Sequence, residues 1–190
     1  MRLPTLLASV LASSLLAGSA VSAPKDWILA GSAPQDYTIS LDHAAPHSGK
    51  ASALLAAKGE PTKGFGTLMQ MTEAGTFVGK RVRFTAQIRA QAVSDWAGLW
   101  FRVDGEKASS LAFDNMQDRP IKGDSGWTSY SIVLDVPKEA AALAFGVLLS
   151  GSGKVWIDSA RFEVVDQSVA TTGAPKHINP PSPTNLDFEQ

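Results

Sequence analysis

A tryptophan and an arginine in the middle of the chain could recognise a ligand. Trp100 and Arg102 alternate with the apolar residues Leu99, Phe101 and Val103, so in a strand they would project away from the core. A tryptophan on an outer face offers a flat apolar surface to the C–H face of a sugar ring, while polar neighbours bind the hydroxyl groups. The pattern therefore predicts a surface for a carbohydrate or a similar polar ligand.

Further candidates for this surface flank Trp100 or lie on the segment that returns beside it. Leu111 and Phe113 would point into the core, so we expect Asp114 to lie on the outer face, near Arg102. An Arg102–Asp114 ion pair would by itself be an ordinary cross-strand contact worth about 0.2–1 kcal/mol. The predicted ligand-binding residues are Trp96, Trp100, Arg102, Asp114, Asn115, Gln117 and Arg119.

The common catalytic and zinc-binding motifs are absent from the sequence. There is no cysteine, no G-x-S-x-G, no H-E-x-x-H and no P-loop. Asp114 and Asp118 could form a carboxylate pair of the glycosidase kind, but nothing in the sequence fixes their partners. His43 and His47 lack an evident third ligand for zinc. We therefore expect a binding protein that requires no cofactor, with a glycoside hydrolase-like enzyme as the less favoured alternative.

Composition and charge limit the classes of partner. The 190 residues are 44% hydrophobic and 18% charged, with a net charge of −1. This near-neutral balance, with scattered lysines and arginines, argues against nucleic acid as a partner. Since there is no cysteine to form disulfides, one ordinary hydrophobic core must hold the fold together by packing.

The start of the chain has the pattern of an export signal. A positive charge precedes a short apolar run, Leu6 to Leu16, and small residues follow up to Ala23. The run is shorter than the about 20 apolar residues that cross a bilayer, so no membrane span is expected after processing. We predict a signal peptide over residues 1–22, cleaved after Ala20 or Ser22, and a periplasmic or secreted protein.

Strand patterns dominate the rest of the chain. Lys80 to Ala90 alternates strictly, and only Lys138 to Ala142 suggests a helical turn. Two hairpins are expected, one joining Leu99–Val103 to Leu111–Gln117 and the other joining Ala142–Ser150 to Lys154–Val165. Further predicted strands are Tyr37–Leu41, Ala51–Ala57, Gly66–Met71 and Ser131–Val136.

Many short strands between turns rich in glycine and proline are typical of a sandwich or a barrel. The expected fold is all-β: a two-sheet antiparallel β-sandwich of jelly-roll type with about eight or nine strands. We expect this domain over residues 23–166. A Pro-rich linker over 167–184 and a strand-like segment over 185–190 would follow it.

The order of several motifs is informative. Four motifs follow one another along the chain: Gly79 to Phe84, Trp127, Val136-Pro137 and Gly153 to Asp158. The same order occurs in bacterial carbohydrate-binding modules, the galactose-binding-like jelly rolls, which this chain resembles. More narrowly, Leu111 to Pro120 and Ala30 to Pro34 are similar to modules of bacterial proteins labelled transcriptional regulators or attached to hydrolases. The resemblance covers Trp27 to Val165. It implies the sandwich and structural roles for Trp127 and Trp156, but it does not specify a ligand.

The resemblance also assigns roles to the end of the chain. In those modules a Glu of the first strand and an Asp of the last strand help to hold a structural Ca²⁺. Here they would be Glu189 and Asp158, because the first-strand motif of the modules is matched only by the terminal segment Asn185–Gln190. That segment could complete its own sheet or remain a tail. It could also add as a strand to another protein or a second copy, which makes a protein-interaction or assembly module the alternative function.

Overall fold

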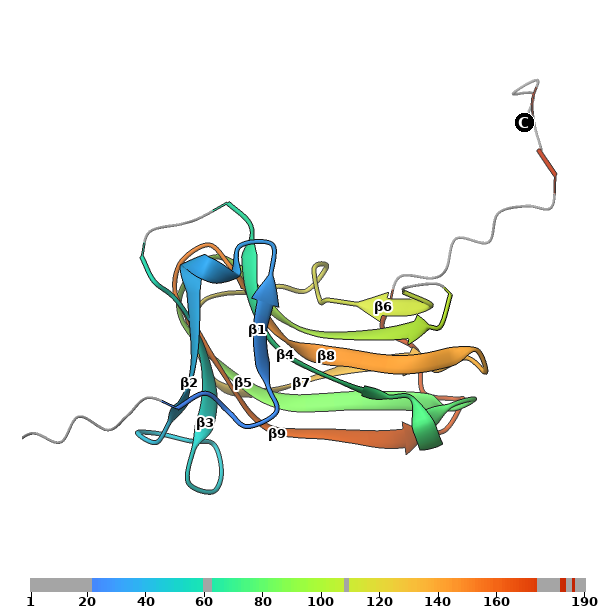
Figure 1. The fold of residues 1–190 in the computed structure, drawn as a ribbon, viewed down its shortest axis with the longest axis horizontal. Coiled ribbons are helices and arrows are strands. Elements are labelled where there is room, and N and C mark those ends of the chain that lie inside the picture. Colours follow the sequence, from blue (N-terminus) through green and yellow to red (C-terminus); the bar gives the residue numbers. More distant parts are fainter. Residues whose placement is uncertain (1–21, 60–62, 108–109, 174–181, 184–185, 187–190) are drawn as a thin grey trace, which may run out of the picture.

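The computed structural model describes residues 22–59, 63–107, 110–173, 182–183 and 186 (Figure 1). Nearly all regular structure in these ranges is β-strand, with two single 3₁₀ turns at Pro34–Asp36 and Gly75–Phe77. No helix in this part of the chain is long and apolar enough to cross a membrane. The strands are β1 (Ile28–Gly31), β2 (Tyr37–Asp42), β3 (Ser52–Ala57), β4 (Phe65–Glu73), β5 (Arg81–Gly105), β6 (Ala112–Asp114), β7 (Ile121–Asp135), β8 (Ala140–Ser150) and β9 (Lys154–Val165).

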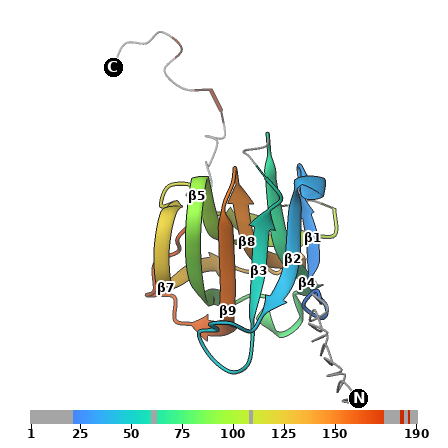
Figure 2. The same cartoon turned by 90° about the vertical axis from the view of Figure 1, so that its left-hand side faces the viewer.

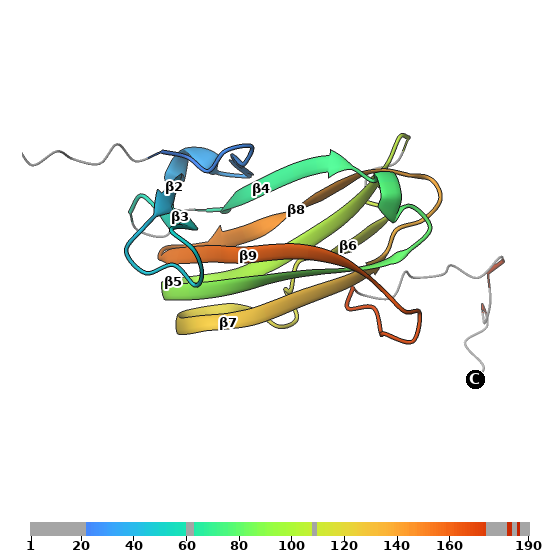
Figure 3. The same cartoon turned by 90° about the horizontal axis from the view of Figure 1, so that it is seen from below.

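The strands form two antiparallel layers that share one long strand. Sheet 1 has the order β1-β4-β8-β5-β6 and uses the second half of β5, whereas sheet 2 has the order β2-β3-β9-β5-β7 and uses the first half. Figure 2 shows the strands of sheet 2 side by side, and Figure 3 shows β4 and β8 on one side of the molecule with β9 and β7 on the other. The predicted all-β, two-sheet sandwich is confirmed.

Strand β5 passes from one sheet to the other through a series of bulges. Its register with β7 shifts between Ile88 and Ala90, between Ala90 and Val93, and between Val93 and Ala97. At this bend Ala92 adopts a φ of 52°. Bulges bend a strand and increase its local twist. The two strands expected over 80–90 and 99–103 are therefore the two arms of a single strand.

The core lies between the two sheets and is rich in phenylalanine. Phe84 stacks on Phe162 with ring centroids 4.6 Å apart, and Phe145 meets Phe162 edge-on at 4.7 Å. Strict alternation places every second residue of the first arm of β5 in this core, as the sequence predicts. The fully buried members of that arm are Val82, Phe84, Ala86 and Ile88.

Two local predictions are wrong. β8 and β9 do not pair with each other, because β8 pairs with β4 and β5 while β9 pairs with β3 and β5. The turn between them crosses from one sheet to the other, although the apolar side chains of both strands do share the core. The helical turn suggested at Lys138–Ala142 is instead a tight turn. In it the N–H of Ala140 donates to the carbonyl of Pro137, and β8 begins at Ala140.

The chain beyond β9 runs back along the edge of sheet 2. We call residues Gln167–Gly173 the strap. Arg81 donates from Nη1 to the carbonyls of Gln167 and Val169, both at 2.7 Å. Thr172 donates its N–H to the carbonyl of Val133, and its hydroxyl oxygen accepts the N–H of Val133, both at 2.9 Å. The first part of the stretch expected to be a linker thus packs on the sandwich, whereas the segment 185–190, apart from Leu186, lies outside the described residues.

Candidate functional site

The pairing of β5 with β6 decides which side chains share a face. Arg102 is paired with Phe113, and Phe101 with Asp114. Directly opposite residues in an antiparallel pair point to the same side of a sheet. Phe113 therefore lies on the outer face with Arg102 and is 43% exposed, whereas Asp114 lies on the side of Phe101 and is 6% exposed.

This arrangement reverses the prediction for the two residues. The expectation that Phe113 points into the core and that Asp114 lies near Arg102 is wrong. After β5 ends, Ser110 has a φ of 65° and the N–H of Leu111 returns to the carbonyl of Val103 at 2.7 Å. This connection places β6 one residue out of the expected register, and a one-residue slip moves every side chain to the other face.

A hollow of 380 Å³ crosses the outer face of sheet 1; we call it the face hollow. It spans all five strands of the sheet, from β1 to β6. Aliphatic and aromatic side chains predominate in its lining. The lining residues are Ala30, Gly31, Phe65, Thr67, Met69, Trp96, Trp100, Arg102, Phe113, Asn115 and Leu148.

Trp100 projects into the face hollow, away from the core between the sheets, as the alternation predicts. Its side chain is only 7% exposed, because Met69, Leu148 and Trp96 surround it in a small apolar cluster that is separate from the main core. Its indole N–H donates to the hydroxyl of Thr67 at 2.7 Å. Trp100 is therefore the fixed floor of the hollow rather than an exposed platform.

Other aromatic side chains stand at the rim of the face hollow. Phe65, at the start of β4, is 37% exposed, and Phe113 is more exposed still. Trp96, at the bend of β5, is half-buried beside Trp100. The sequence does not indicate that β4 contributes to the lining of the face hollow, because residues on both sides of this strand are buried. Thr67 and Met69 are buried on the outer side and Leu68 on the inner side.

Arg102 is held at the rim by an acid of its own strand. Its Nε and Nη2 donate to Oδ2 of Asp104 at 3.0 and 2.8 Å, and the N–H of Ser110 donates to Oδ1 of the same carboxylate at 2.7 Å. The expected ion pair of Arg102 with Asp114 does not form. Because Asp104 pairs with it at 2.8 Å, the positive charge of Arg102 is largely offset at this point.

Asp114 and Arg119 organise the loop that follows β6. Asp114 accepts the N–H of Met116 at 2.8 Å and pairs with Nη2 of Arg119 at 2.6 Å. Arg119 also pairs with Asp118 at 2.7 Å. Although partial burial acts to lower it, the pKa of Arg119 is raised above its ordinary value by these two carboxylates. Arg119 is absent from the lining of the face hollow, and its contacts are those of a loop anchor.

A second hollow of 470 Å³ adjoins the first at the edge of sheet 1; we call it the edge hollow. It is lined by polar side chains of the β6–β7 loop, by Phe113 and by the end of the strap. Of the predicted ligand-binding residues, Asn115 lines both hollows, and Asp114 and Gln117 line only this one. The full lining is Phe113, Asp114, Asn115, Gln117, Asp118, Thr172 and Gly173.

Asp158, expected as a calcium ligand, fastens the loop between β2 and β3. Its Oδ2 accepts the N–H groups of His47 and Ser48 at 2.9 and 3.1 Å, and its Oδ1 accepts the hydroxyls of Ser48 and Ser159 at 3.2 and 3.1 Å. Burial acts to raise its pKa, but the hydrogen bonds from Ser48 and Ser159 hold the pKa below its ordinary value. Glu189 lies outside the described residues.

The described part of the chain contains no group of three histidine or acidic side chains placed to bind a metal. His47 instead lies against Trp127, with ring centroids 5.7 Å apart, and His43 donates from Nδ1 to the carbonyl of Lys50 at 2.9 Å. Trp127 donates its indole N–H to the carbonyl of Ala45. These contacts tie the β2–β3 loop to sheet 2.

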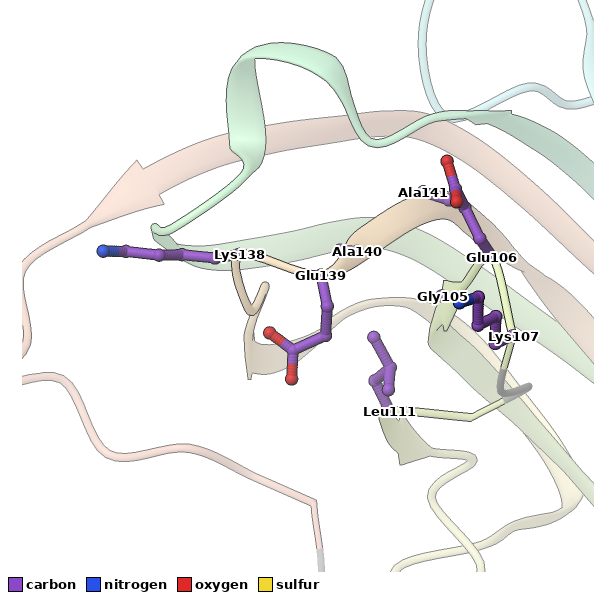
Figure 4. Close-up of a pocket in the computed structure, with 8 residues that line it drawn as sticks. All are labelled: Gly105, Glu106, Lys107, Leu111, Lys138, Glu139, Ala140 and Ala141. Atoms are coloured by element: carbon purple, nitrogen blue, oxygen red, sulfur yellow. The ribbon is translucent and has the colours of Figure 1, made fainter.

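A further hollow of 340 Å³ lies beside the start of β8, where the β5–β6 connection begins. Figure 4 shows that its charged side chains do not converge: Lys138 extends away from the hollow, and the carboxylates of Glu106 and Glu139 point in different directions. A site for chemistry needs groups that meet at one point. We therefore place the candidate site on sheet 1.

Comparisons with known proteins support the fold. No family model matches the chain. A relative from Bacillus subtilis (strain 168), named as the uncharacterized HTH-type transcriptional regulator YbfP, is 42% identical over 172 residues, which are 87% of this chain and 57% of that protein. The chain thus spans less than two thirds of that relative's length.

Two solved structures share the sandwich at low identity. The CBM22-1 xylan-binding domain of Paenibacillus barcinonensis Xyn10C matches with a TM-score of 0.53 and 12% identity, over 75% of this chain and 88% of that one. The Stig cyclase Fisc from Fischerella sp. TAU matches with a TM-score of 0.57 and 16% identity, over 80% of this chain and 91% of that one. At such identities the likeness defines a class of fold, a β-sandwich found in carbohydrate-binding modules and in other proteins.

Proposed function

We propose that this domain binds carbohydrate in the face hollow and catalyses no reaction on it. The observation that carries the proposal is an open hollow of 380 Å³ whose floor is a tryptophan held in place by Thr67 and whose rim carries Trp96 and Phe113. Sugar rings have apolar C–H faces that stack on aromatic rings. Ligand sites of 300–1,000 Å³ with few, well-placed polar groups are the general pattern for small molecules.

The polar groups at the rim favour an uncharged ligand. Arg102 is fixed by Asp104, so it presents N–H donors whose charge is already compensated. Asn115 accepts the N–H of Gln117 at its Oδ1, and its side-chain NH₂ makes no hydrogen bond within the described residues. Fixed donors of this kind suit sugar hydroxyls, and we expect binding to depend only weakly on salt concentration.

The lining also supports a role without catalysis. The described residues of the face hollow include no aspartate, glutamate, histidine or tyrosine. Proton transfer in catalysis needs such a group within hydrogen-bond reach of the substrate. The fold itself does not decide the matter, because one of the similar structures is a cyclase.

The similar structures suggest which ligands to test first. One of them is described as a xylan-binding domain, so linear plant-type polysaccharides are the first class to try. We further propose that the domain acts outside the cytoplasm, on the basis of the export pattern of residues 1–22.

A glycan array tests this proposal. We expect the wild-type domain to retain a subset of neutral glycans and Phe113→Ala to weaken that retention about tenfold, which corresponds to one lost aromatic contact. Val164→Ala is the matched control, because Val164 is an exposed apolar residue on β9 of sheet 2. The proposal fails if no glycan is retained, or if Phe113→Ala and Trp100→Ala both bind as well as the wild type.

A further inference from the structure

The two hollows on sheet 1 adjoin each other at its edge strand, β6. They share Phe113 and Asn115, and Phe113 stands between them on β6. The face hollow measures 380 Å³ and the edge hollow 470 Å³. A ligand in the first hollow can therefore continue past the ring of Phe113 into the second.

The lining changes character from one hollow to the other. The face hollow is mainly apolar, whereas polar side chains from the end of β6 and from the β6–β7 loop line the edge hollow: Asp114, Asn115, Gln117 and Asp118. The side-chain amide of Gln117 and the NH₂ of Asn115 make no hydrogen bond among the described residues. Two free amide groups beside an exposed aromatic ring can bind the hydroxyls of a sugar that lies against that ring.

The far wall of the edge hollow is the strap. Thr172 and Gly173 line it, and both positions are fixed by sheet 2 on one side and β6 on the other. Thr172 makes two hydrogen bonds to the backbone of Val133. Gly173 lies so close to β6 that a Cβ there would be 2.8 Å from the carbonyl oxygen of Phe113 and 3.1 Å from a methyl carbon of Leu134. In Figure 1 the continuous described part of the chain accordingly ends beside β6.

We propose that the strap completes the binding site and that the ligand is a linear oligosaccharide that passes from the face hollow around Phe113 into the edge hollow. This inference rests on the proposed function. A single sugar ring can occupy only one of the two hollows, whereas a chain of linked rings can contact both. Affinity should therefore increase with chain length, and the increase should depend on the strap.

The test uses an array of linear β-1,4-linked xylo-, cello- and manno-oligosaccharides of two and six units. The readout is the ratio of six-unit to two-unit affinity, which we expect to be about tenfold or more for the wild type. Gly173→Val forces the strap away from the Phe113 carbonyl, and Gln117→Ala removes a free amide from the edge hollow. Both should bring the ratio close to one. Ala170→Ser, an exposed position of the strap outside both linings, is the control and should keep the wild-type ratio.

The outcomes distinguish a failure of the inference about the strap from a failure of the proposed carbohydrate binding. If the wild type binds two-unit and six-unit chains equally, or if neither variant changes the ratio, the inference about the strap is overturned while carbohydrate binding stands. If the wild type retains no oligosaccharide, the proposed function falls and the inference falls with it. Melting temperatures show whether Gly173→Val is folded. If it is not, Gln117→Ala decides, because its side chain is exposed and makes no hydrogen bond among the described residues.

Discussion

The indole N–H of Trp100 depends on a single partner in the described part of the chain. It donates to the hydroxyl of Thr67 at 2.7 Å, and that hydroxyl donates in turn to the carbonyl of Val147 at 2.9 Å. Both side chains are buried, so water cannot readily replace either bond. These two bonds connect three neighbouring strands and fix the plane of the ring that forms the floor of the face hollow.

Thr67→Val tests this arrangement, because valine keeps the shape of threonine and removes the hydroxyl. We expect it to lower the free energy of unfolding by about 1–3 kcal/mol, since the indole N–H is then left without an acceptor in a buried place. Urea unfolding monitored by tryptophan fluorescence measures the loss. Thr67→Ser keeps the hydroxyl and loses only a methyl group, at about 1 kcal/mol. If the serine variant proves less stable than the valine variant, the hydrogen bond does not hold the ring.

Individual side-chain orientations could be predicted only where they depend on one strand. The outward direction of Trp100 follows from alternation with Leu99 and Phe101, and it is found as expected. Whether the ring of Trp100 is exposed or covered depends on Met69 and Leu148, which come from other strands. The side of the sheet to which Phe113 or Asp114 points depends on the length and conformation of the connection before β6. Alternation within a strand does not predict that connection.

At the level of secondary structure, the bend of β5 and the turn between β8 and β9 form one unit. Gly151 has a φ of 76° and Gly153 a φ of 113°, and the turn packs directly on the bend. A Cβ at Gly153 would lie 2.5 Å from the carbonyl oxygen of Ala92, which is backbone and cannot move aside easily. The turn thus supports the place where β5 passes between the sheets.

We expect Gly153→Ala to destabilise the domain by at least about 1–3 kcal/mol, because alanine is strained at this φ and its methyl group also meets the backbone of β5. The matched control is Gly126→Ala in β7, where a Cβ would have no neighbour within 4 Å and φ is not positive. That variant should be neutral or slightly more stable, since a strand glycine is unfavourable relative to alanine. Thermal unfolding of the two variants measures the difference, and equal melting temperatures would contradict the proposed contact.

Strands with clear alternation were predictable, whereas the connections between them were not. Both halves of β5 and the strands β8 and β9 lie where alternating apolar residues place them. The middle of β5, Gln91 to Gly98, lacks alternation because the strand bends there and changes sheets. The first half of β7 is polar and contains two glycines, so its sequence does not predict a strand. A three-residue glycine turn is equally compatible with a hairpin and with a crossing between sheets, which is why the pairing of β8 with β9 was predicted wrongly.

Across the whole molecule, carboxylates fasten the segments that surround the two sheets. The N–H of Ala44 and the indole of Trp156 hold the pKa of Asp42 below its ordinary value, and Arg81 does the same for Asp135. At Asp158, hydrogen bonds from Ser48 and Ser159 outweigh the effect of burial and lower the pKa. Asp42 and Asp158 hold the β2–β3 loop, and Asp135 fixes the arginine that binds the strap.

These lowered pKa values predict how stability depends on pH. A carboxyl whose pKa is lower in the folded state contributes its full stability above its unfolded pKa, about 3.9 for aspartate, and loses it as the pH falls through the folded value. The melting temperature should therefore be nearly constant from pH 7 to about 5 and should fall steeply below about pH 4. Calorimetry at pH 7, 5 and 3 measures this profile.

Asp158→Asn distinguishes the contribution of the loop anchor from the general effect of acid. The amide keeps one acceptor oxygen but carries no charge, so the variant should be less stable than the wild type at pH 7 and should approach it at pH 3, where the wild-type carboxyl is itself becoming protonated. Glu106→Gln on the β5–β6 connection is the control, because this exposed carboxyl makes no hydrogen bond or ion pair among the described residues, and its curve should follow that of the wild type. If the Asp158→Asn curve stays parallel to the wild type down to pH 3, the anchoring of the β2–β3 loop does not depend on the charge of Asp158.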